Sequence, residues 1–386
     1  MKIVHLCLGS FFIDNYTYQE NMLPKYHVLM GYEVTVIASL VSFDSAGALC
    51  FIEGASTYWN ADGVKVIRLN YNKKMPFIVS SQLRFYEGLY KKLDQEKPDL
   101  IFIHGLCFCD VFEVKKYVRR NPQITLYADS HTDYINSGKK WLSRNILHKI
   151  IWRKCYQTLL PYIKLYFGVT PLRCEFLMDV YRIPMSKVKL LLMGVDDRFV
   201  SELPLNIRMI VREEFGIMPD DFVIISGGKL DSLKNTDKLI SSLLQINNPK
   251  AHLIIFGTVT LSFKKKFDEL IDRASNIHYV GWASHENVIK YILSSDLACY
   301  PGTHSTLWEE SVGLGVPCIF KRWIGMQHLN INGNCFFVSG DDLNELKTCI
   351  QTLVDSKLEY NKIKCKADIA AKHFKYSDIS KQAIGL

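Results

Sequence analysis

The sequence predicts an α/β protein made of two doubly wound domains. The chain has 386 residues, of which 48% are apolar and 22% are charged. That length exceeds one ordinary α/β core, and so apolar a chain is not expected to be disordered. Strand-like and helix-like patterns alternate along the chain in the manner of a parallel sheet, and the alternation starts twice.

The first domain is predicted over residues 1–196. Its first strand is an apolar run that ends at Gly9. Thr17 and Glu20 have the spacing of a capping box, which opens a helix expected to end at Gly31. We assign His104 and the following glycine to a loop. The strand candidates cover residues 3–8, 33–38, 64–69, 99–104, 124–128 and 165–169.

The second domain is predicted over residues 197–370, and residues 371–386 are expected to return to the first domain. Its strand candidates cover residues 222–226, 253–256, 278–280, 297–300, 318–320 and 335–338. Helical stretches are expected around residues 234–244, 263–274 and 286–293. Ligands of doubly wound sheets bind beyond the carboxyl ends of the strands, so two such sheets facing each other predict a central cleft.

Composition and charge indicate the cellular compartment and the class of partner. The net charge of +8 favours anionic partners, but the basic residues are spread along the chain and form no recognised nucleic-acid module. The eleven cysteines show neither zinc spacing nor a disulfide framework, which indicates free thiols in a reducing cytosol. No segment approaches the roughly 20 apolar residues of a membrane span. We expect a cytoplasmic protein without nucleic-acid partners.

Two lysines follow the first strand of the second domain. Gly227 and Gly228 end this strand, and Lys229 and Lys234 then stand near the start of a helix. Helix amides and ammonium groups together neutralise a diphosphate. The alternative is a turn with two solvated lysines.

A second motif covers residues 301–317, directly after a strand. Thr306 and Glu309 have the spacing of a capping box, and Glu310 follows. Neighbouring carboxylates project about 100° apart on a helix, so at most one of the two faces a ligand. The alternative is that Glu309 only caps the helix and Glu310 is a surface charge.

Residues 139–154 combine apolar side chains with lysines and arginines, a pattern suited to an anionic membrane surface. The alternative is a helix that faces the core and carries a basic outer face. On the first interpretation the protein is peripheral on the inner face of the cell membrane.

Taken together, these motifs resemble the family-four retaining glycosyltransferases of the GT-B fold. The resemblance rests on Lys229 and Lys234, on Val280-Gly281-Trp282, and on the run from Tyr300 through Glu310 to Pro317. In the first domain it rests on residues 31–36 and 187–196. It implies two Rossmann-like domains with parallel sheets facing a central cleft.

The resemblance also implies a role for each matching position. Lys229, which stands where the family usually has arginine, and Lys234 would grip the donor diphosphate. Gly228 belongs to the same loop, Glu310 would bind the ribose, and Gly281 and Trp282 would meet the nucleobase. The first domain contributes His131, which would lie near the donor sugar, and Gly9, which would lie near the diphosphate. As a lone histidine after a strand, His131 has a structural alternative.

One position departs from the family pattern. The family has a first glutamate that is separated by seven residues from the position of Glu310, whereas this chain has Gly302 there. Contacts to the donor sugar are therefore expected from His304 or from the amides of Thr303, Ser305 and Thr306.

The resemblance implies a nucleotide-sugar-dependent enzyme of the hexosyltransferase type, serving polysaccharide biosynthesis. A retaining transfer needs orientation and leaving-group stabilisation rather than a protein nucleophile. The sequence has no Asp-x-Asp motif, so no metal or cofactor is expected. The expected acceptor is a glycan or lipid-linked glycan. The alternatives are a sugar-nucleotide epimerase or hydrolase of the same fold, and a non-catalytic partner subunit.

Overall fold

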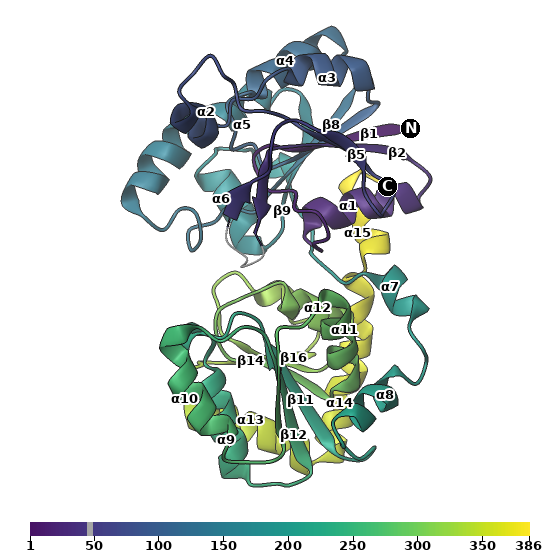
Figure 1. The fold of residues 1–386 in the computed structure, drawn as a ribbon, viewed down its shortest axis with the longest axis vertical. Helices are drawn as coiled ribbons and strands as arrows, with labels where there is room; N and C mark the ends of the chain where they lie inside the picture. The colour runs from purple at the N-terminus through teal and green to yellow at the C-terminus, as the bar shows by residue number, and fades with distance from the viewer. Residues whose placement is uncertain (45–48) are drawn as a thin grey trace. The chain divides into compact units, whose positions relative to one another are not determined.

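The computed structural model describes residues 1–44 and 49–386. It divides into two compact units: Met1–Leu192 with Ile379–Leu386, and Met193–Asp378. Each unit has a sheet with helices packed on its faces, as Figure 1 shows for each by itself. The α/β fold class predicted from the alternation of strands and helices is confirmed.

Within the described residues, the first unit contains an eight-stranded sheet in the order β10-β9-β8-β7-β1-β2-β6-β5. Neighbouring strands are parallel except for β5, which runs antiparallel to β6. The strands are β1 (Lys2–Cys7), β2 (Glu33–Ala38), β5 (Thr57–Trp59), β6 (Lys65–Arg68), β7 (Leu100–His104), β8 (Thr125–Ser130), β9 (Ile163–Gly168) and β10 (Val188–Leu190). A separate hairpin pairs β3 (Val41–Phe43) with β4 (Leu49–Phe51). The central strands β1, β7 and β8 are almost wholly buried, as expected of a parallel sheet covered on both faces.

The helices of the first unit connect these strands. They are α1 (Gln19–Leu29), α2 (Phe77–Leu83), α3 (Leu89–Glu96), α4 (Val111–Arg120), η1 (Ser143–Trp152), α5 (Arg153–Leu159) and α6 (Pro171–Asp179). The capping box expected at Thr17 and Glu20 is wrong, because the residue before α1 is Tyr18 and no side chain caps the helix. Glu20 is instead buried, and its carboxylate lies near His131.

The second unit, whose residues 193–378 are all described, contains a six-stranded parallel sheet in the order β13-β12-β11-β14-β15-β16. Its strands are β11 (Phe222–Gly227), β12 (Ala251–Phe256), β13 (Ile277–Gly281), β14 (Leu297–Tyr300), β15 (Cys318–Lys321) and β16 (Cys335–Val338). Its helices are α7 (Asp197–Glu202), α8 (Ile207–Glu214), α9 (Thr236–Ile246), α10 (Leu261–Ile271), α11 (His285–Ser294), α12 (Leu307–Gly313), α13 (Leu343–Asp355) and α14 (Lys357–Ala370). Its short turns of helix are η3 (Ser232–Lys234), η4 (Gln327–Leu329) and η5 (Ala371–His373), and a further short turn, η2 (Met185–Lys187), belongs to the first unit.

The last helix, α15 (Tyr376–Ala383), leads the chain from the second unit to the first. Ile379, Ala383 and Ile384 are buried there, and the Ser380 carbonyl accepts a hydrogen bond from His27 Nε2 at 2.9 Å. Across the described residues, every helix is too short or too polar to span a membrane.

Candidate functional site

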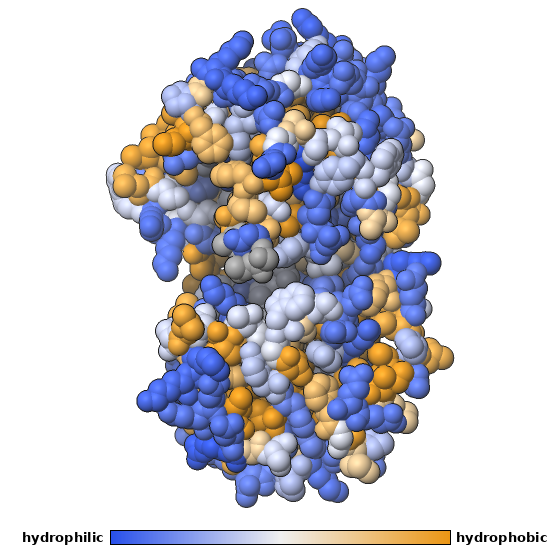
Figure 2. Space-filling view, in the orientation of Figure 1, coloured by the Kyte–Doolittle hydropathy of each residue, from blue (hydrophilic) through white to orange (hydrophobic). Residues whose placement is uncertain are grey.

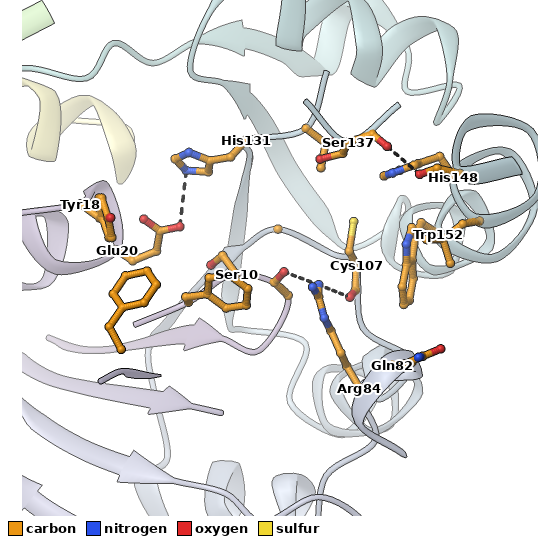
Figure 3. A pocket seen from close by; sticks show the side chains of 17 residues that line it. Ser10, Tyr18, Glu20, Gln82, Arg84, Cys107, His131, Ser137, His148 and Trp152 are labelled. Atoms are coloured by element: carbon orange, nitrogen blue, oxygen red, sulfur yellow. Dashed lines mark hydrogen bonds and ion pairs between the residues drawn. The ribbon is translucent and has the colours of Figure 1, made fainter. Parts of the chain in front are cut away.

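The first unit holds a pocket of about 590 Å³ at the carboxyl ends of β1, β7 and β8 (Figure 3). The loop after β1 contributes Gly9 and Ser10, α1 contributes Glu20, and the loop after β8 contributes His131. Helix η1 closes another side with Trp152. The pocket lies where ligands of doubly wound sheets bind.

Gly9 allows two loops of this pocket to pack against each other. A Cβ atom at this position would lie only 2.1 Å from the Gly105 carbonyl oxygen, so no larger residue fits. The guanidinium of Arg84 donates to the Gly9 carbonyl and, at 2.7 Å, to the Cys107 carbonyl. Figure 3 shows this side chain bridging the two loops.

His131 lies between two carboxylates at the rim of the pocket. Its Nε2 atom is 3.6 Å from Asp129 Oδ2 and 3.8 Å from Glu20 Oε1. Burial lowers the pKa of His131, but the charges of Glu20 and Asp129 outweigh it, and the net pKa lies above the ordinary value. Figure 3 shows Glu20 and His131 pointing toward one another. The imidazole therefore tends to carry a positive charge.

The nearby Asp133 has a structural role. Its Oδ1 accepts from the backbone amides of Ile135 and Asn136, both at 2.8 Å, and its Oδ2 accepts from Arg173 Nε at 3.2 Å. Of the two aspartates that flank His131, only Asp129 faces it.

In the second unit, the loop after β11 brings Lys234 next to the loop after β14. Lys234 Nζ donates to the Thr303 carbonyl at 2.7 Å, and burial lowers its pKa. A Cβ atom on Gly228 would lie 3.9 Å from Lys234 Cε, so the two positions are adjacent. Lys229 follows Gly228 and is exposed.

Gly302 is packed directly against this loop. A Cβ atom there would lie 2.3 Å from Lys234 Cα and 2.4 Å from the Leu233 carbonyl oxygen. The Thr303 amide also donates to the Leu233 carbonyl at 3.0 Å. A glutamate at position 302 would therefore displace the backbone that carries Lys234.

Glu309 is fully buried and does not cap α12. The capping box is wrong, because Thr306 makes no side-chain hydrogen bond at the helix start. The Glu309 carboxylate instead accepts from His304 Nε2 at 3.0 and 3.1 Å and lies 3.6 Å from His328 Nε2. Burial raises the pKa of Glu309, but the charge of His304 and hydrogen bonds from both histidines lower it to about 2.

Glu310 presents a buried carboxylate oxygen with no protein partner. Its Oε1 accepts from His285 Nε2 at 3.1 Å, while Oε2 has no hydrogen bond within the described part of the chain. His285 is the first residue of α11. Trp282, which follows Gly281 at the end of β13, is 76% exposed. The interpretation of Glu310 as a surface charge does not hold, because the side chain is buried.

The structure brings some of the predicted residues together within each unit. His131 and Gly9 share the pocket of the first unit. In the second unit, Gly228, Lys234 and Thr303 are adjacent, and Ser305 Oγ is a buried atom without a partner among the described residues. No group of three or more His, Cys, Asp or Glu side chains in residues 1–44 and 49–386 is arranged to hold a metal ion.

The sequence interpretation missed several polar residues of these regions: Glu20, Arg84, His285 and His328. It also missed a row of buried histidines behind His131, formed by His5, His27 and His104. His5 and His104 sit within apolar strands, and an isolated polar residue in a buried strand was the available signal. His104 ends β7, as the strand candidate 99–104 predicted, and is fully buried, so its additional assignment to a loop is wrong.

Comparison with known proteins gives a family match to part of the chain and a similar fold. Residues 208–367 match the family described as glycosyl transferases group 1. The sucrose-phosphate synthase of Thermosynechococcus elongatus is similar in structure, with a TM-score of 0.69 and 13% identity over 99% of this chain and 96% of that chain. Anabaena HepE in complex with UDP has a TM-score of 0.67 and 16% identity over 99% and 98%.

A third similar structure is the UDP-GlcNAc 2-epimerase of Neisseria meningitidis bound to UDP-GlcNAc. Its TM-score is 0.64 with 14% identity, over 100% of this chain and 98% of that chain. Identities this low show a shared fold alone. No curated protein matches the sequence.

Proposed function

We infer the function from the GT-B fold of this chain and from the family to which residues 208–367 belong, the glycosyl transferases of group 1. We propose that the protein transfers a hexose from a nucleoside diphosphate sugar to a glycan or lipid-linked glycan, with retention of anomeric configuration. No metal ion or cofactor takes part.

The observation that carries this proposal is the environment of Glu310. One carboxylate oxygen is held by His285, and the other is buried without a partner among the described residues. An unpaired buried acceptor of this kind costs free energy unless a ligand supplies a donor. A ribose offers two neighbouring hydroxyl donors, and the exposed ring of Trp282 is available for a nucleobase to stack on.

The diphosphate binds at the loops that follow β11 and β14. Lys229 and Lys234 supply positive charge, and the amides of Thr303, Ser305 and Thr306 supply donors. Burial lowers the pKa of Lys234, and the negative charge of a bound diphosphate would raise it again.

The transfer needs no protein nucleophile. The acceptor hydroxyl attacks the anomeric carbon on the face from which the diphosphate departs, and its proton passes to the departing phosphate oxygen. One bond forms between the acceptor oxygen and the anomeric carbon while the bond to phosphate breaks. Orientation and stabilisation of the leaving group provide the rate enhancement. His131 assists the transfer as an imidazole that tends to carry a positive charge near the sugar.

We further propose that the first unit rests on an anionic membrane surface where a lipid-linked acceptor resides. Trp141, Leu142, Ile146 and Ile150 are exposed, while His148 and Trp152 on the same segment are buried. The outer face of this segment therefore carries apolar side chains, and Lys139, Lys140 and Lys154 are exposed on the same segment. Figure 2 shows hydrophobic surface along the same side of the first unit, where α2 also exposes Phe77 and Ile78.

The function is tested by measuring thermal stability with UDP, GDP, dTDP and CMP nucleotides, then product formation with the best donor. A ligand that binds only the native state raises the melting temperature. We expect one nucleoside diphosphate to bind and its sugar to appear on an acceptor. An altered or hydrolysed donor without acceptor would indicate the epimerase or hydrolase, and binding without turnover over a broad acceptor panel would indicate the non-catalytic subunit.

A further inference from the structure

Three buried histidines form a hydrogen-bonded chain behind the pocket of the first unit. His27 Nε2 contacts the Ser380 carbonyl at 2.9 Å, and His27 Nδ1 contacts His5 Nε2 at 3.0 Å. His5 Nδ1 contacts His104 Nε2 at 2.9 Å, and His104 Nδ1 contacts Asp129 Oδ2 at 2.8 Å. Four hydrogen bonds thus connect the C-terminal helix α15 to Asp129.

Water does not reach these groups. The side chains of His5, His27, His104 and Asp129 are all fully buried. The histidines come from β1, α1 and β7, and their rings lie roughly parallel, with centroids 5.1 Å apart for His5 and His27 and 5.2 Å apart for His5 and His104. Each short contact therefore needs its own proton from within the chain, because two facing lone pairs repel and no solvent can intervene.

Three neutral histidines carry too few protons to form all four hydrogen bonds. Both ends of the chain are acceptors, a backbone carbonyl at Ser380 and a carboxylate at Asp129. A neutral imidazole carries one N–H, so three neutral histidines provide three protons for four hydrogen bonds. The chain therefore holds one additional proton, on an imidazole or on the carboxyl group.

The surroundings place this proton on His104. Burial, and then the neighbouring histidine charges, hold the pKa of His5 well below its ordinary value. Burial likewise lowers the pKa of His27 to about 4. Burial raises the pKa of Asp129, but the charges of His104 and His131 outweigh it and leave the net pKa low. His104 is also the histidine in direct contact with the carboxylate, at 2.8 Å, so a cationic His104 beside an anionic Asp129 forms all four hydrogen bonds and pairs the two charges.

We propose that His104 is a positioning residue that carries a proton on both ring nitrogens and holds Asp129 as an anion facing His131. This deepens the proposed function, since it rests on a role for His131 in the transfer. The charged or titratable groups around Asp129 and His131 are His104 on β7, Glu20 on α1, Cys7 on β1 and Arg173 on α6. The positive charge of His104 offsets Asp129 and so limits how strongly Asp129 raises the pKa of His131.

The second unit contains a natural control. His252 Nε2 contacts Asp221 Oδ2 at 3.2 Å, and His252 Nδ1 contacts His278 Nε2 at 3.1 Å. Among the described residues, His278 Nδ1 has no acceptor in the protein. Two neutral imidazoles carry two N–H protons, one for each of these two contacts, so His252 needs no additional proton.

The experiment is side-chain ¹⁵N spectroscopy of histidine-labelled protein without substrate, with resonances assigned by single substitutions. At neutral pH we expect both nitrogens of His104 to be protonated, whereas one nitrogen of His252 should be unprotonated. An unprotonated Nδ1 or Nε2 on His104 would overturn the proposal.

The variant His27→Phe tests the proton count. It removes the contact to the Ser380 carbonyl, so two histidines then make two hydrogen bonds and His104 should become neutral. With the positive charge beside Asp129 lost, the titration midpoint of His131 should rise by about one pH unit. The matched variant His278→Phe should leave the protonation of His104 and the midpoint of His131 unchanged.

An unchanged His131 midpoint in His27→Phe would contradict the proposal. If that variant does not fold, the comparison of His104 with His252 in the wild-type protein still decides the question. Because these measurements use no substrate, they stand apart from the test of transfer activity. Loss of transfer alone would count against the proposed function and not against the charged His104.

Discussion

At the scale of single residues, two adjacent carboxylates have separate roles because they leave the same helix in different directions. Glu309 points into the second unit, where His304 and His328 surround it. Glu310 keeps one buried oxygen without a partner among the described residues. On the function proposed above, this difference in surroundings gives Glu309 a structural role and leaves Glu310 for the ligand.

Replacing Glu310 by glutamine should weaken binding of the nucleoside diphosphate and of the complete sugar donor alike, because the ribose is common to both. A hydrogen bond to a charged group contributes about 1.5–3 kcal/mol, so the Kd should rise roughly 10- to 100-fold in calorimetric titration. Glu286→Gln, an exposed carboxylate on α11, is the control. Equal small losses in both variants would remove Glu310 from the nucleotide site.

Glu309 should make the protein sensitive to acid. Its folded pKa of about 2 lies below the ordinary 4.5, so the stability it contributes is present above pH 4.5 and is lost as the pH falls toward 2. The full contribution is at most about 3 kcal/mol. Denaturant unfolding of wild type and Glu309→Gln at several pH values should show the gap between them closing over this window. A gap that stays constant with pH would contradict the assignment.

At the scale of elements, the loop after β14 is shaped by its contact with the loop after β11. Thr303 is hydrogen-bonded to both Leu233 and Lys234. The absence of a side chain at Gly302 is what allows this approach. The glycine at position 302 is therefore coupled to the position of Lys234.

Gly302→Ala should lower the melting temperature, since the new Cβ atom would lie 2.3 Å from Lys234 Cα. Overpacking of this kind typically costs about 1–3 kcal/mol. Gly302→Glu, which supplies the family's carboxylate, should be at least as destabilising and should also weaken diphosphate binding. Ser305→Ala in the same loop is the control, with little expected effect on stability. Higher transfer activity in Gly302→Glu would show that the loop accommodates the carboxylate after all.

At the scale of the whole molecule, the two units differ in the chemical groups that they place at the carboxyl ends of their strands. The first unit offers a pocket lined by aromatic side chains, two histidines and a carboxylate. The second offers lysines, amides and Glu310. The first unit also contains an apolar segment with flanking basic residues. This distribution agrees with the proposal of a lipid-linked acceptor and a soluble donor.

Anionic vesicles should recover the protein in sedimentation assays, and neutral vesicles should recover less. Screening lengths shorten to about 3 Å at 1 M salt, so binding should fall there. The double variant Ile146→Ser with Ile150→Ser should reduce binding without loss of fold, because both side chains are exposed. Leu261→Ser, at a position in the second unit that is 94% exposed, is the matched control. If neutral and anionic vesicles recovered equal amounts of protein, the membrane proposal would be wrong.

The sequence by itself determined the fold class and the loops in which polar residues gather. Short apolar runs and intervening helices mark a parallel sheet, and the carboxyl end of each strand follows directly from the run. This located Gly9, His131, Lys234 and Glu310 at strand ends or in the segments after them. Local patterns were less reliable at helix starts: the boxes at Thr17 and Thr306 fail because both glutamates have histidine partners elsewhere.

Only the tertiary structure decided which polar residues meet. His5 and His104 are 99 positions apart in the chain, yet β1 and β7 are adjacent strands and bring their rings into contact. The need for glycine at position 302 is explained only by the backbone of Lys234, which packs against it. Hydrophobic periodicity depends on near neighbours in the chain, whereas hydrogen bonding between buried side chains depends on how sheets and helices assemble.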